Sequence, residues 1–346
     1  MTRLAIVGAG VMGSNHARVA GALPDVEIVA VVEPDPVRGR ELADGVGARY
    51  LPDVSLLDDR VDAAVVAAPS AAHAPIGVEL LGRGVDVLME KPIAETVEAG
   101  RSLVDAAARH GRILMVGHIE RFNPAILVLD EVLTEVLYLD MARIGPYSPR
   151  VRDDVILDLM IHDLELALAF AGSPATDVYS VSRSVHSPAE DIANALLRFE
   201  SGMTASVAAH RAGQSKIRRM TITQDDSFVR VDLVRQEVLI ERRYQGEFTS
   251  KTGRVYRQTG VTEVPFLEKR GEPLALEMAH FLDCVRTRET PRVTGSQGVA
   301  ALDLALRVKE CCQTPAGSTA AAMPGASNRI SSSSTGASSS ETAARA

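Results

Sequence analysis

The chain has 346 residues, a length typical of two domains, and 46% of them are hydrophobic, which is enough to build substantial cores. Trp is absent and aromatic residues make up 4%, so these cores must consist mainly of aliphatic side chains. The formal net charge of -8, without any basic stripe interleaved with aromatics, argues against nucleic acid as a partner.

The cysteines and the first residues predict the compartment. Cys284, Cys311 and Cys312 are odd in number, two of them are adjacent, and their spacing fits no metal site. The chain begins directly with a strand-like pattern, and no apolar run approaches the roughly 18 residues that a membrane-spanning helix needs. We therefore expect a soluble protein of the reducing cytoplasm, without a metal and without membrane attachment.

A glycine-rich loop follows the first predicted strand. Leu4–Val7 is entirely apolar, as in a strand buried on both faces, and residues 14–23 have a helical pattern. The loop between them, GAGVMG, contains Gly8, Gly10, Val11, Met12 and Gly13. In such a loop the first glycine permits a tight turn, the second admits a pyrophosphate, and the third lets helix and strand pack closely. The setting predicts that these residues bind a dinucleotide at a helix N-terminus.

Glu33 follows the second predicted strand, 26–32, and stands 20 residues after Gly13. A carboxylate at this position accepts hydrogen bonds from the adenosine ribose hydroxyls and repels a 2'-phosphate. No arginine follows immediately, although Arg38 is near. The sequence therefore favours NAD over NADP.

Strand and helix patterns then alternate up to residue 116. Strands are predicted at 61–68, 85–89 and 112–116, and helices at 74–83 and 93–110. Such alternation builds a parallel sheet, and ligands lie beyond the carboxyl ends of its strands. The residues at these ends are Pro69 to His73, Glu90 to Pro92, and Gly117 with His118. We expect Pro69, His73 and Glu90 to contact the cofactor, although His73 fits equally well as a helix cap.

Lys91 is a candidate for the chemistry. It follows a buried strand and stands between an acid and a proline, at the edge where a nicotinamide should lie. Most lysines are solvated surface charges, but the position of Lys91 favours a functional role.

A second candidate group lies in an apolar helical stretch. Asp158 and His162 are four residues apart, on one face of a predicted helix whose other positions are almost all apolar. Burying an acid and an imidazole together is costly unless they serve each other, and an Asp can orient a His and prepare it to take a proton. The alternative is a polar pair that ties this helix to a neighbour.

Taken together, GAGVMG, Glu90-Lys91-Pro92 and Asp158-x-x-x-His162 resemble the Gfo/Idh/MocA oxidoreductases, over about residues 3–312. The resemblance implies a Rossmann domain, residues 1–118, followed by an α+β domain with an open, mostly antiparallel sheet, residues 119–312. It also implies that Lys91 contacts the nicotinamide ribose and the substrate hydroxyl, with Asp158 and His162 beside the reacting carbon. One departure is that residues 152–155 replace a glycine-rich segment found in many members.

Three further segments narrow the resemblance. GHIERFNP (117–124), RIGPYSPR (143–150) and LDLMIHDLEL (157–166) look most like the UDP-N-acetylglucosamine 3-dehydrogenase subgroup, whose members oxidise the sugar C3 hydroxyl to a ketone with NAD. The resemblance implies that Arg121 and Asn123 face the sugar or its phosphates. The alternative for both is a structured connector between the domains.

The implied reaction removes an alcohol proton while a hydride leaves for the nicotinamide. We expect His162 to be the base, oriented by Asp158, and Lys91 to stabilise the developing alkoxide, with Lys91 as base the close alternative. A second reading changes the substrate to an inositol or another free sugar. A third makes the protein a non-catalytic NAD-dependent sensor, which the presence of Lys91, Asp158 and His162 disfavours.

The second half of the chain predicts a sheet with one free face. Strand patterns joined by short turns recur at 177–185, 193–199, 203–210, 217–223, 228–233 and 237–242. An antiparallel sheet can leave one face open, and an apolar open face predicts a homodimer or homotetramer. Lys216, Arg218 and Arg219 fit a solvated strand edge better than a diphosphate contact.

The remaining segments carry fewer signals. Residues 245–262 are polar and predict a loop or weak hairpin, and helices are predicted at 273–286 and 298–312. Residues 313–346 consist largely of Ala, Ser, Thr, Gly and Pro, which predicts a disordered tail.

Overall fold

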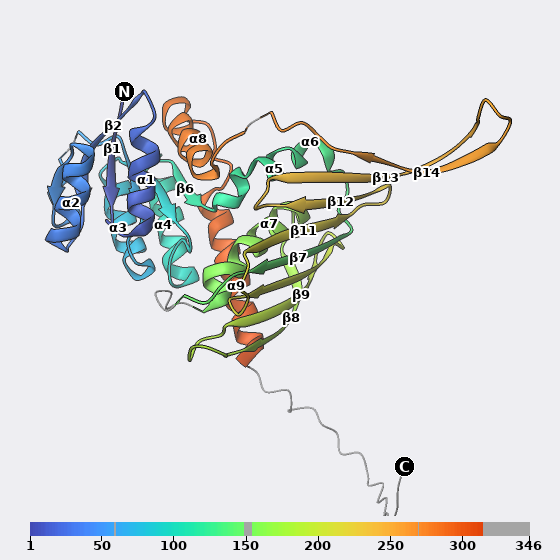
Figure 1. Ribbon diagram of the computed structural model, residues 1–346. Coiled ribbons are helices and arrows are strands. Elements are labelled where there is room, and N and C mark those ends of the chain that lie inside the picture. The colour runs from blue at the N-terminus through green and yellow to red at the C-terminus, as the bar shows by residue number, and fades with distance from the viewer. Residues whose placement is uncertain (59, 149–153, 269, 314–346) are drawn as a thin grey trace, which may run out of the picture. The chain divides into compact units, whose positions relative to one another are not determined.

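The computed structural model describes residues 1–58, 60–148, 154–268 and 270–313. Residues 1–313 form one compact unit that contains two sheets (Figure 1). Beyond Gln313, the predicted tail lies outside the described residues. So do residues 152 and 153 of the loop that departs from the family pattern. The predicted boundary between residues 118 and 119 falls where the first sheet ends, and it stays a prediction.

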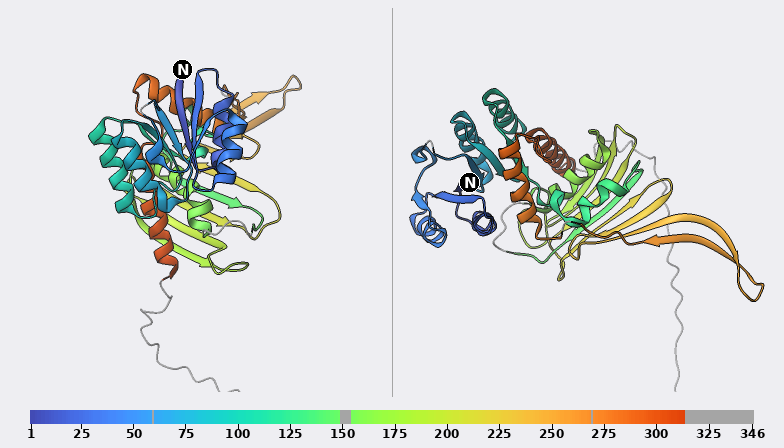
Figure 2. Two further views of the ribbon diagram at one scale, coloured as in Figure 1. Left: turned by 90° about the vertical axis from the view of Figure 1, so that its left-hand side faces the viewer. Right: turned by 90° about the horizontal axis from the view of Figure 1, so that it is seen from above.

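The first sheet is parallel and six-stranded, as the alternation predicts. Its strands are β1 (Thr2–Val7), β2 (Val26–Val32), β3 (Arg49–Leu51), β4 (Ala63–Val66), β5 (Asp86–Glu90) and β6 (Leu114–Gly117). They lie in the order β3-β2-β1-β4-β5-β6. Strands β4, β5 and β6 are buried at every position, because helices cover both faces of the sheet (Figure 2).

The helices of this first half are α1 (Val11–Gly21), α2 (Pro36–Val46), α3 (Ser70–Gly82) and α4 (Val97–His110), with a 3-10 turn η1 (Val54–Leu56). Their ends follow local chemistry. Asp35 caps α2 and Thr96 caps α4 through side-chain oxygens, and Gly111 ends α4 in the left-handed conformation.

The second sheet is mixed and mostly antiparallel. Its strands are β7 (Tyr138–Ile144), β8 (Ala175–Arg183), β9 (Ile192–Phe199), β10 (Thr204–His210), β11 (Ile217–Thr223), β12 (Ser227–Asp232), β13 (Glu237–Thr249) and β14 (Val255–Glu263). The order is β14-β13-β12-β11-β7-β10-β9-β8, with β7 and β10 parallel. Burial alternates along β9 and β10, so one face packs on helices and the other is open.

The segment at 245–262 is better ordered than a loop. It forms most of the hairpin β13–β14, whose strands run past the end of β12, so that its outer part is a two-stranded ribbon (Figure 1). The ribbon carries a stacked pair of aromatic rings, Phe248 and Tyr256, with centroids 5.3 Å apart.

The remaining elements connect the two sheets. They are η2 (Ile119–Phe122), α5 (Pro124–Leu127), α6 (Leu129–Val132), the π-helical turn η3 (Ile156–Met160), α7 (Ile161–Ala171), α8 (Pro273–Thr287) and α9 (Gly295–Gln313). Helix α9 places Leu302 in the core of the first sheet and Leu304 with Val308 in that of the second. It therefore fixes the carboxyl edge of the first sheet against η3. No helix in the described part of the chain is long and apolar enough to cross a membrane.

Candidate active site

The glycine loop has the backbone that a dinucleotide requires. Gly8 has φ +100°, and a Cβ at Gly8 would lie 2.6 Å from the Ala67 carbonyl oxygen. A Cβ at Gly13 would lie 1.8 Å from the Gly8 carbonyl oxygen, whereas one at Gly10 would meet no atom within 4 Å. No side chain caps the N-terminus of α1, so its N–H groups are free to bind an anion. The loop thus fits a pyrophosphate beside Gly10.

This geometry separates two glycine substitutions. In Gly10→Ala the fold should survive, but the methyl group should block the pyrophosphate and weaken NAD binding by about tenfold to a hundredfold, as loss of a hydrogen bond to a charged group does. In Gly13→Ala the clash should lower Tm as well. Titration of NAD by calorimetry together with thermal unfolding distinguishes them, and equal Tm losses would contradict the assignment.

Glu33 braces the glycine loop. Its buried carboxylate accepts hydrogen bonds from Ala9 N at 2.8 Å, Asp35 N at 3.1 Å and Arg38 Nη2 at 2.9 Å. The loop conformation therefore depends on Glu33 directly. Its contact with the adenosine ribose stays a prediction.

His73 and Glu90, which the sequence predicts to contact the cofactor, both make hydrogen-bond contacts within the protein. The buried ring of His73 lies with Nδ1 2.9 Å from Pro92 O and Nε2 2.8 Å from Ala68 O, so it ties two strand-end loops together and caps no helix. The buried carboxylate of Glu90 contacts His16 Nε2 at 2.7 Å and accepts from Lys91 N at 3.1 Å. Both residues stabilise the loops at the carboxyl ends of the strands, and their contact with the cofactor stays a prediction.

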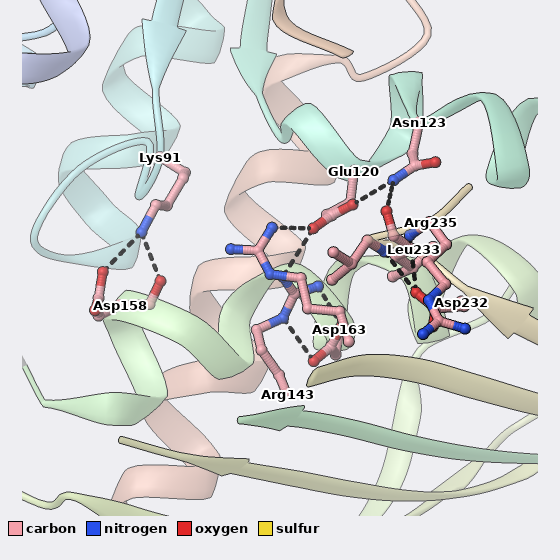
Figure 3. A network of polar contacts seen from close by, with 11 residues as sticks. Lys91, Glu120, Asn123, Arg143, Asp158, Asp163, Asp232, Leu233 and Arg235 are labelled. Carbon is pink, nitrogen blue, oxygen red and sulfur yellow. Dashed lines mark hydrogen bonds and ion pairs between the residues drawn. The ribbon is translucent and has the colours of Figure 1, made fainter. Parts of the chain in front are cut away.

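Lys91 reaches from the end of β5 to the π-helical turn η3. Its Nζ donates to the backbone oxygen of Asp158 at 2.7 Å and lies 3.5 Å from Asp158 Oδ1 (Figure 3). Residues 67 positions apart in the sequence are thus brought together, as the resemblance implies.

The sequence predicts that Asp158 orients His162, but within the described part of the chain the structure shows no hydrogen bond between the two side chains. The Asp158 carboxylate faces Lys91 instead. The physical reason is the π-helical geometry of Ile156–Met160, because its wider turn no longer places residues four apart directly above one another. Asp158 therefore positions Lys91 in this structure.

His162 is held neutral. Burial, followed by the charges of Lys91 and Arg143, lowers the pKa of His162 well below its ordinary value. Its Nδ1 is buried without a hydrogen-bond partner among the described residues, and the partly exposed ring leaves Nε2 as the nitrogen open to a ligand. A neutral imidazole with an accessible Nε2 can accept a proton.

His118 lies next to His162, and the sequence indicated it only as a strand-end residue. The two rings meet edge to face, with centroids 6.1 Å apart and planes at 86°. His118 is 1% exposed, and burial, then Lys91 and Arg121, lower its pKa to about 3.

The pKa of His118 predicts acid sensitivity. Since the unfolded chain takes up a proton below the ordinary pKa of 6.5 while folded His118 does not until about 3, the free energy of unfolding should fall as pH falls through this window. Each such histidine contributes about 1.4 kcal/mol per pH unit. Urea unfolding at pH 6, 5 and 4 should therefore show a shallower loss for His118→Phe. Parallel curves for the two proteins would contradict this.

In the polar loop 120–123, the side chains of Arg121 and Asn123 make hydrogen bonds to other parts of the protein. Asn123 is buried, caps α5 by accepting from Ala125 N, and donates to Glu120 Oε2 at 3.1 Å and Leu233 O at 3.0 Å (Figure 3). Both N–H groups and one lone pair of the amide oxygen are used, which fits the connector role, and a contact of Asn123 with the substrate stays a prediction. The Arg121 guanidinium donates to Glu165 Oε1 at 2.9 Å and is mostly buried.

A buried ionic network joins this loop to the second sheet. Arg143, on β7, donates to both oxygens of Asp163 at 2.6 and 2.9 Å and to Glu120 Oε1 at 2.8 Å (Figure 3). Arg218 donates to the same Glu120 oxygen at 2.9 Å. Burial alone would raise the pKa of Glu120, but Arg143 and Arg218 hold it below its usual value. Arg218 therefore belongs to the network and not to a solvated strand edge.

Comparisons with known proteins agree with this fold. Residues 2–118 match an oxidoreductase family with an NAD-binding Rossmann fold, and residues 143–227 match the Gfo/Idh/MocA C-terminal domain. The chain is 31% identical over 309 residues to a UDP-N-acetylglucosamine 3-dehydrogenase of Acidithiobacillus ferrooxidans, a match that covers 89% of this chain and 96% of the relative.

Two other similarities extend the comparison. The solved structure of the A. ferrooxidans enzyme has a TM-score of 0.81 at 30% identity, covering 89% of this chain and 96% of that one. A scyllo-inositol 2-dehydrogenase (NAD(+)) of Bacillus subtilis is 25% identical over 327 residues, which cover 88% of this chain and 92% of the relative.

Proposed function

Because the chain belongs to the Gfo/Idh/MocA family of NAD-dependent oxidoreductases, we propose that it oxidises C3 of a UDP-N-acetylhexosamine such as UDP-N-acetylglucosamine to a ketone. The observation that carries the proposal is the meeting of Lys91 with the Asp158–His162 turn at the nicotinamide edge. Similarity to the A. ferrooxidans dehydrogenase along nearly its whole length supports the substrate.

The residues of the site divide the proposed reaction between them. When bound, NAD accepts the hydride. His162 Nε2 accepts the hydroxyl proton, which its neutral state permits. Lys91 donates a hydrogen bond to the same oxygen and stabilises the negative charge that develops there, while Asp158 holds the Lys91 side chain in reach.

The cations near the site favour an anionic substrate over a neutral one. The exposed Lys216 lies next to Arg218, whose charge, with partial burial, lowers the pKa of Lys216. We propose that Lys216 contacts a diphosphate, in place of the solvated strand edge that its sequence setting favours. An inositol has no charge that would use it.

Lys216→Met provides a direct measurement of that contact. The KM for UDP-N-acetylglucosamine should rise by about tenfold, with kcat little changed, because a hydrogen bond to a charged group that is equal in ground and transition states is lost. Arg219→Met is the matched control, since the exposed Arg219 is the next residue along β11 after Arg218 and faces the other side of the sheet. An unchanged KM in Lys216→Met would remove the diphosphate assignment.

The substrate itself is tested by reduction of NAD. UDP-N-acetylglucosamine, UDP-N-acetylgalactosamine, myo-inositol and scyllo-inositol are offered side by side, and nicotinamide absorbance is followed. Turnover of only the inositols would establish the alternative function, for which the B. subtilis relative is the reason. The site of oxidation follows from the product by nuclear magnetic resonance.

We further propose that the protein forms a dimer or tetramer through the open face of the second sheet. Tyr179, Val181 and Leu196 are 69%, 67% and 59% exposed on neighbouring strands β8 and β9, an apolar surface that self-association would cover. Light scattering should show that Val181→Glu with Leu196→Glu dissociates the assembly, whereas Leu56→Glu, on η1, does not. A wild-type monomer would refute it.

We also propose that the protein works in the reducing cytoplasm. The three cysteines form no disulfide, as expected of a protein that works in the reducing cytoplasm.

A further inference from the structure

Three buried ring nitrogens belong to the proposed base, His162, and to its neighbour His118. His118 Nδ1, His118 Nε2 and His162 Nδ1 have no hydrogen-bond partner among the described residues. Buried polar atoms without a hydrogen-bond partner are uncommon in proteins, so three of them on two neighbouring rings call for an explanation. The two rings that carry these atoms meet edge to face, with centroids 6.1 Å apart.

His162 needs a partner on Nδ1 in order to act as a base. A neutral imidazole carries its proton on one nitrogen only, and Nε2 can accept a proton only in the tautomer protonated on Nδ1. Asp158 does not supply that partner, because Lys91 engages it. Among the described residues, His118 is the ring that lies against His162.

We propose that His118 is a positioning residue for the dehydrogenase reaction, which sets the tautomer of His162 through one water shared by the two rings. In this arrangement His162 Nδ1–H donates to the water, and the water donates to a ring nitrogen of His118. His162 Nε2 then presents its lone pair to the substrate hydroxyl. Buried waters typically bridge polar groups that would otherwise be unsatisfied.

The surroundings of His118 suit this role. The charges that act on it are those of Lys91 and Arg121, both positive, so the ring stays neutral and keeps a lone pair for accepting. No carboxylate makes a hydrogen bond to either ring within the described residues. The pair can therefore hold a fixed tautomer without drawing the proton away from His162.

The test measures the tautomer of His162 directly. The NAD-bound enzyme, labelled with 15N-histidine, is examined by long-range proton–nitrogen correlation spectra at neutral pH, and the His162 signals are assigned by their loss in His162→Asn. Wild-type His162 should appear as the Nδ1-protonated tautomer. In His118→Phe, which keeps a ring without nitrogens, the Nε2-protonated tautomer should appear, and kcat should fall by about tenfold, equivalent to one hydrogen bond, with KM little changed.

Two further variants complete the test. His118→Gln restores a hydrogen-bonding group and should recover part of the Nδ1-protonated population. His210→Phe is the matched control, because His210 Nδ1 is likewise buried without a partner in the described part of the chain, but on β10. His210→Phe should leave the His162 signals and kcat unchanged. Asp158→Asn tests the competing assignment.

The proposal is overturned if His162 is protonated on Nε2 in the wild type, or if it keeps its Nδ1 proton in His118→Phe. It is also overturned if Asp158→Asn, and not His118→Phe, changes the tautomer. It rests on the proposed function, since it assumes that His162 is the base, but the spectra need no substrate. Failure of the substrate assignment would leave the tautomer result standing, and the two failures are thereby distinguishable.

Discussion

Replacing His162 by Asn is expected to lower kcat by about a hundredfold or more, the contribution typical of a positioned general base. The asparagine side chain fits the space and can hydrogen-bond, but it cannot take a proton at neutral pH. In this variant kcat and kcat/KM should fall by the same factor, because the proton is transferred only in the transition state. Steady-state reduction of NAD with the substrate identified above measures both constants.

The close alternative makes Lys91 the base and leaves His162 a binding group. In that case His162→Asn should retain near-normal kcat and raise only KM. The control is His186→Asn, since His186 is exposed and its ring packs on Tyr147. It should match the wild type in both constants. Near-normal turnover in His162→Asn would transfer the role of base to Lys91.

The first half of the fold could be predicted because its signals are local. The glycines of the loop are required by backbone geometry at fixed offsets, and the all-apolar strands alternate with helices in a way that only a parallel sheet accommodates. The position of Lys91 followed from the rule that ligands lie at carboxyl strand ends. The structure brings Lys91 to Asp158, which no local pattern specifies.

The details of the site could not be predicted because they depend on tertiary contacts. A four-residue spacing implies a shared face only if the turn is α-helical, and Ile156–Met160 is π-helical. His118 has no partner at a regular spacing, since it meets His162 across two elements. Buried Asn123 also donates to Leu233 O, 110 residues away, a contact that no local pattern specifies.

Charge around the site has a consequence for the base. The residues whose positive charges act on His162 include Lys91, Arg143 and Arg218. Each of them opposes protonation of the ring, which keeps His162 neutral but also makes it a weaker proton acceptor. In the proposed reaction, the same charges would oppose the imidazolium but stabilise the negative charge that develops on the substrate oxygen.

Replacing Arg143 by Met is expected to have the largest effect on stability, a loss of about 3–5 kcal/mol in the free energy of unfolding, as for a buried ion pair that loses one partner. Arg143 is 2% exposed, and its guanidinium is the only group that hydrogen-bonds the Asp163 carboxylate among the described residues. Burial already raises the pKa of Asp163 with Arg143 present. Urea unfolding followed by circular dichroism measures the loss.

Two further variants test whether the loss of stability comes from the burial of this network. Arg198→Met removes an exposed partner of Asp177, at 3.8 Å, and should cost about 0–1 kcal/mol. In Arg143→Met with Asp163→Leu the uncompensated charge is gone, so much of the stability should return, because an apolar pair of similar volume replaces a buried ionic one at little cost. A loss below about 1 kcal/mol in Arg143→Met alone would mean that water reaches Asp163 and that the network does not hold η2, β7 and α7 together.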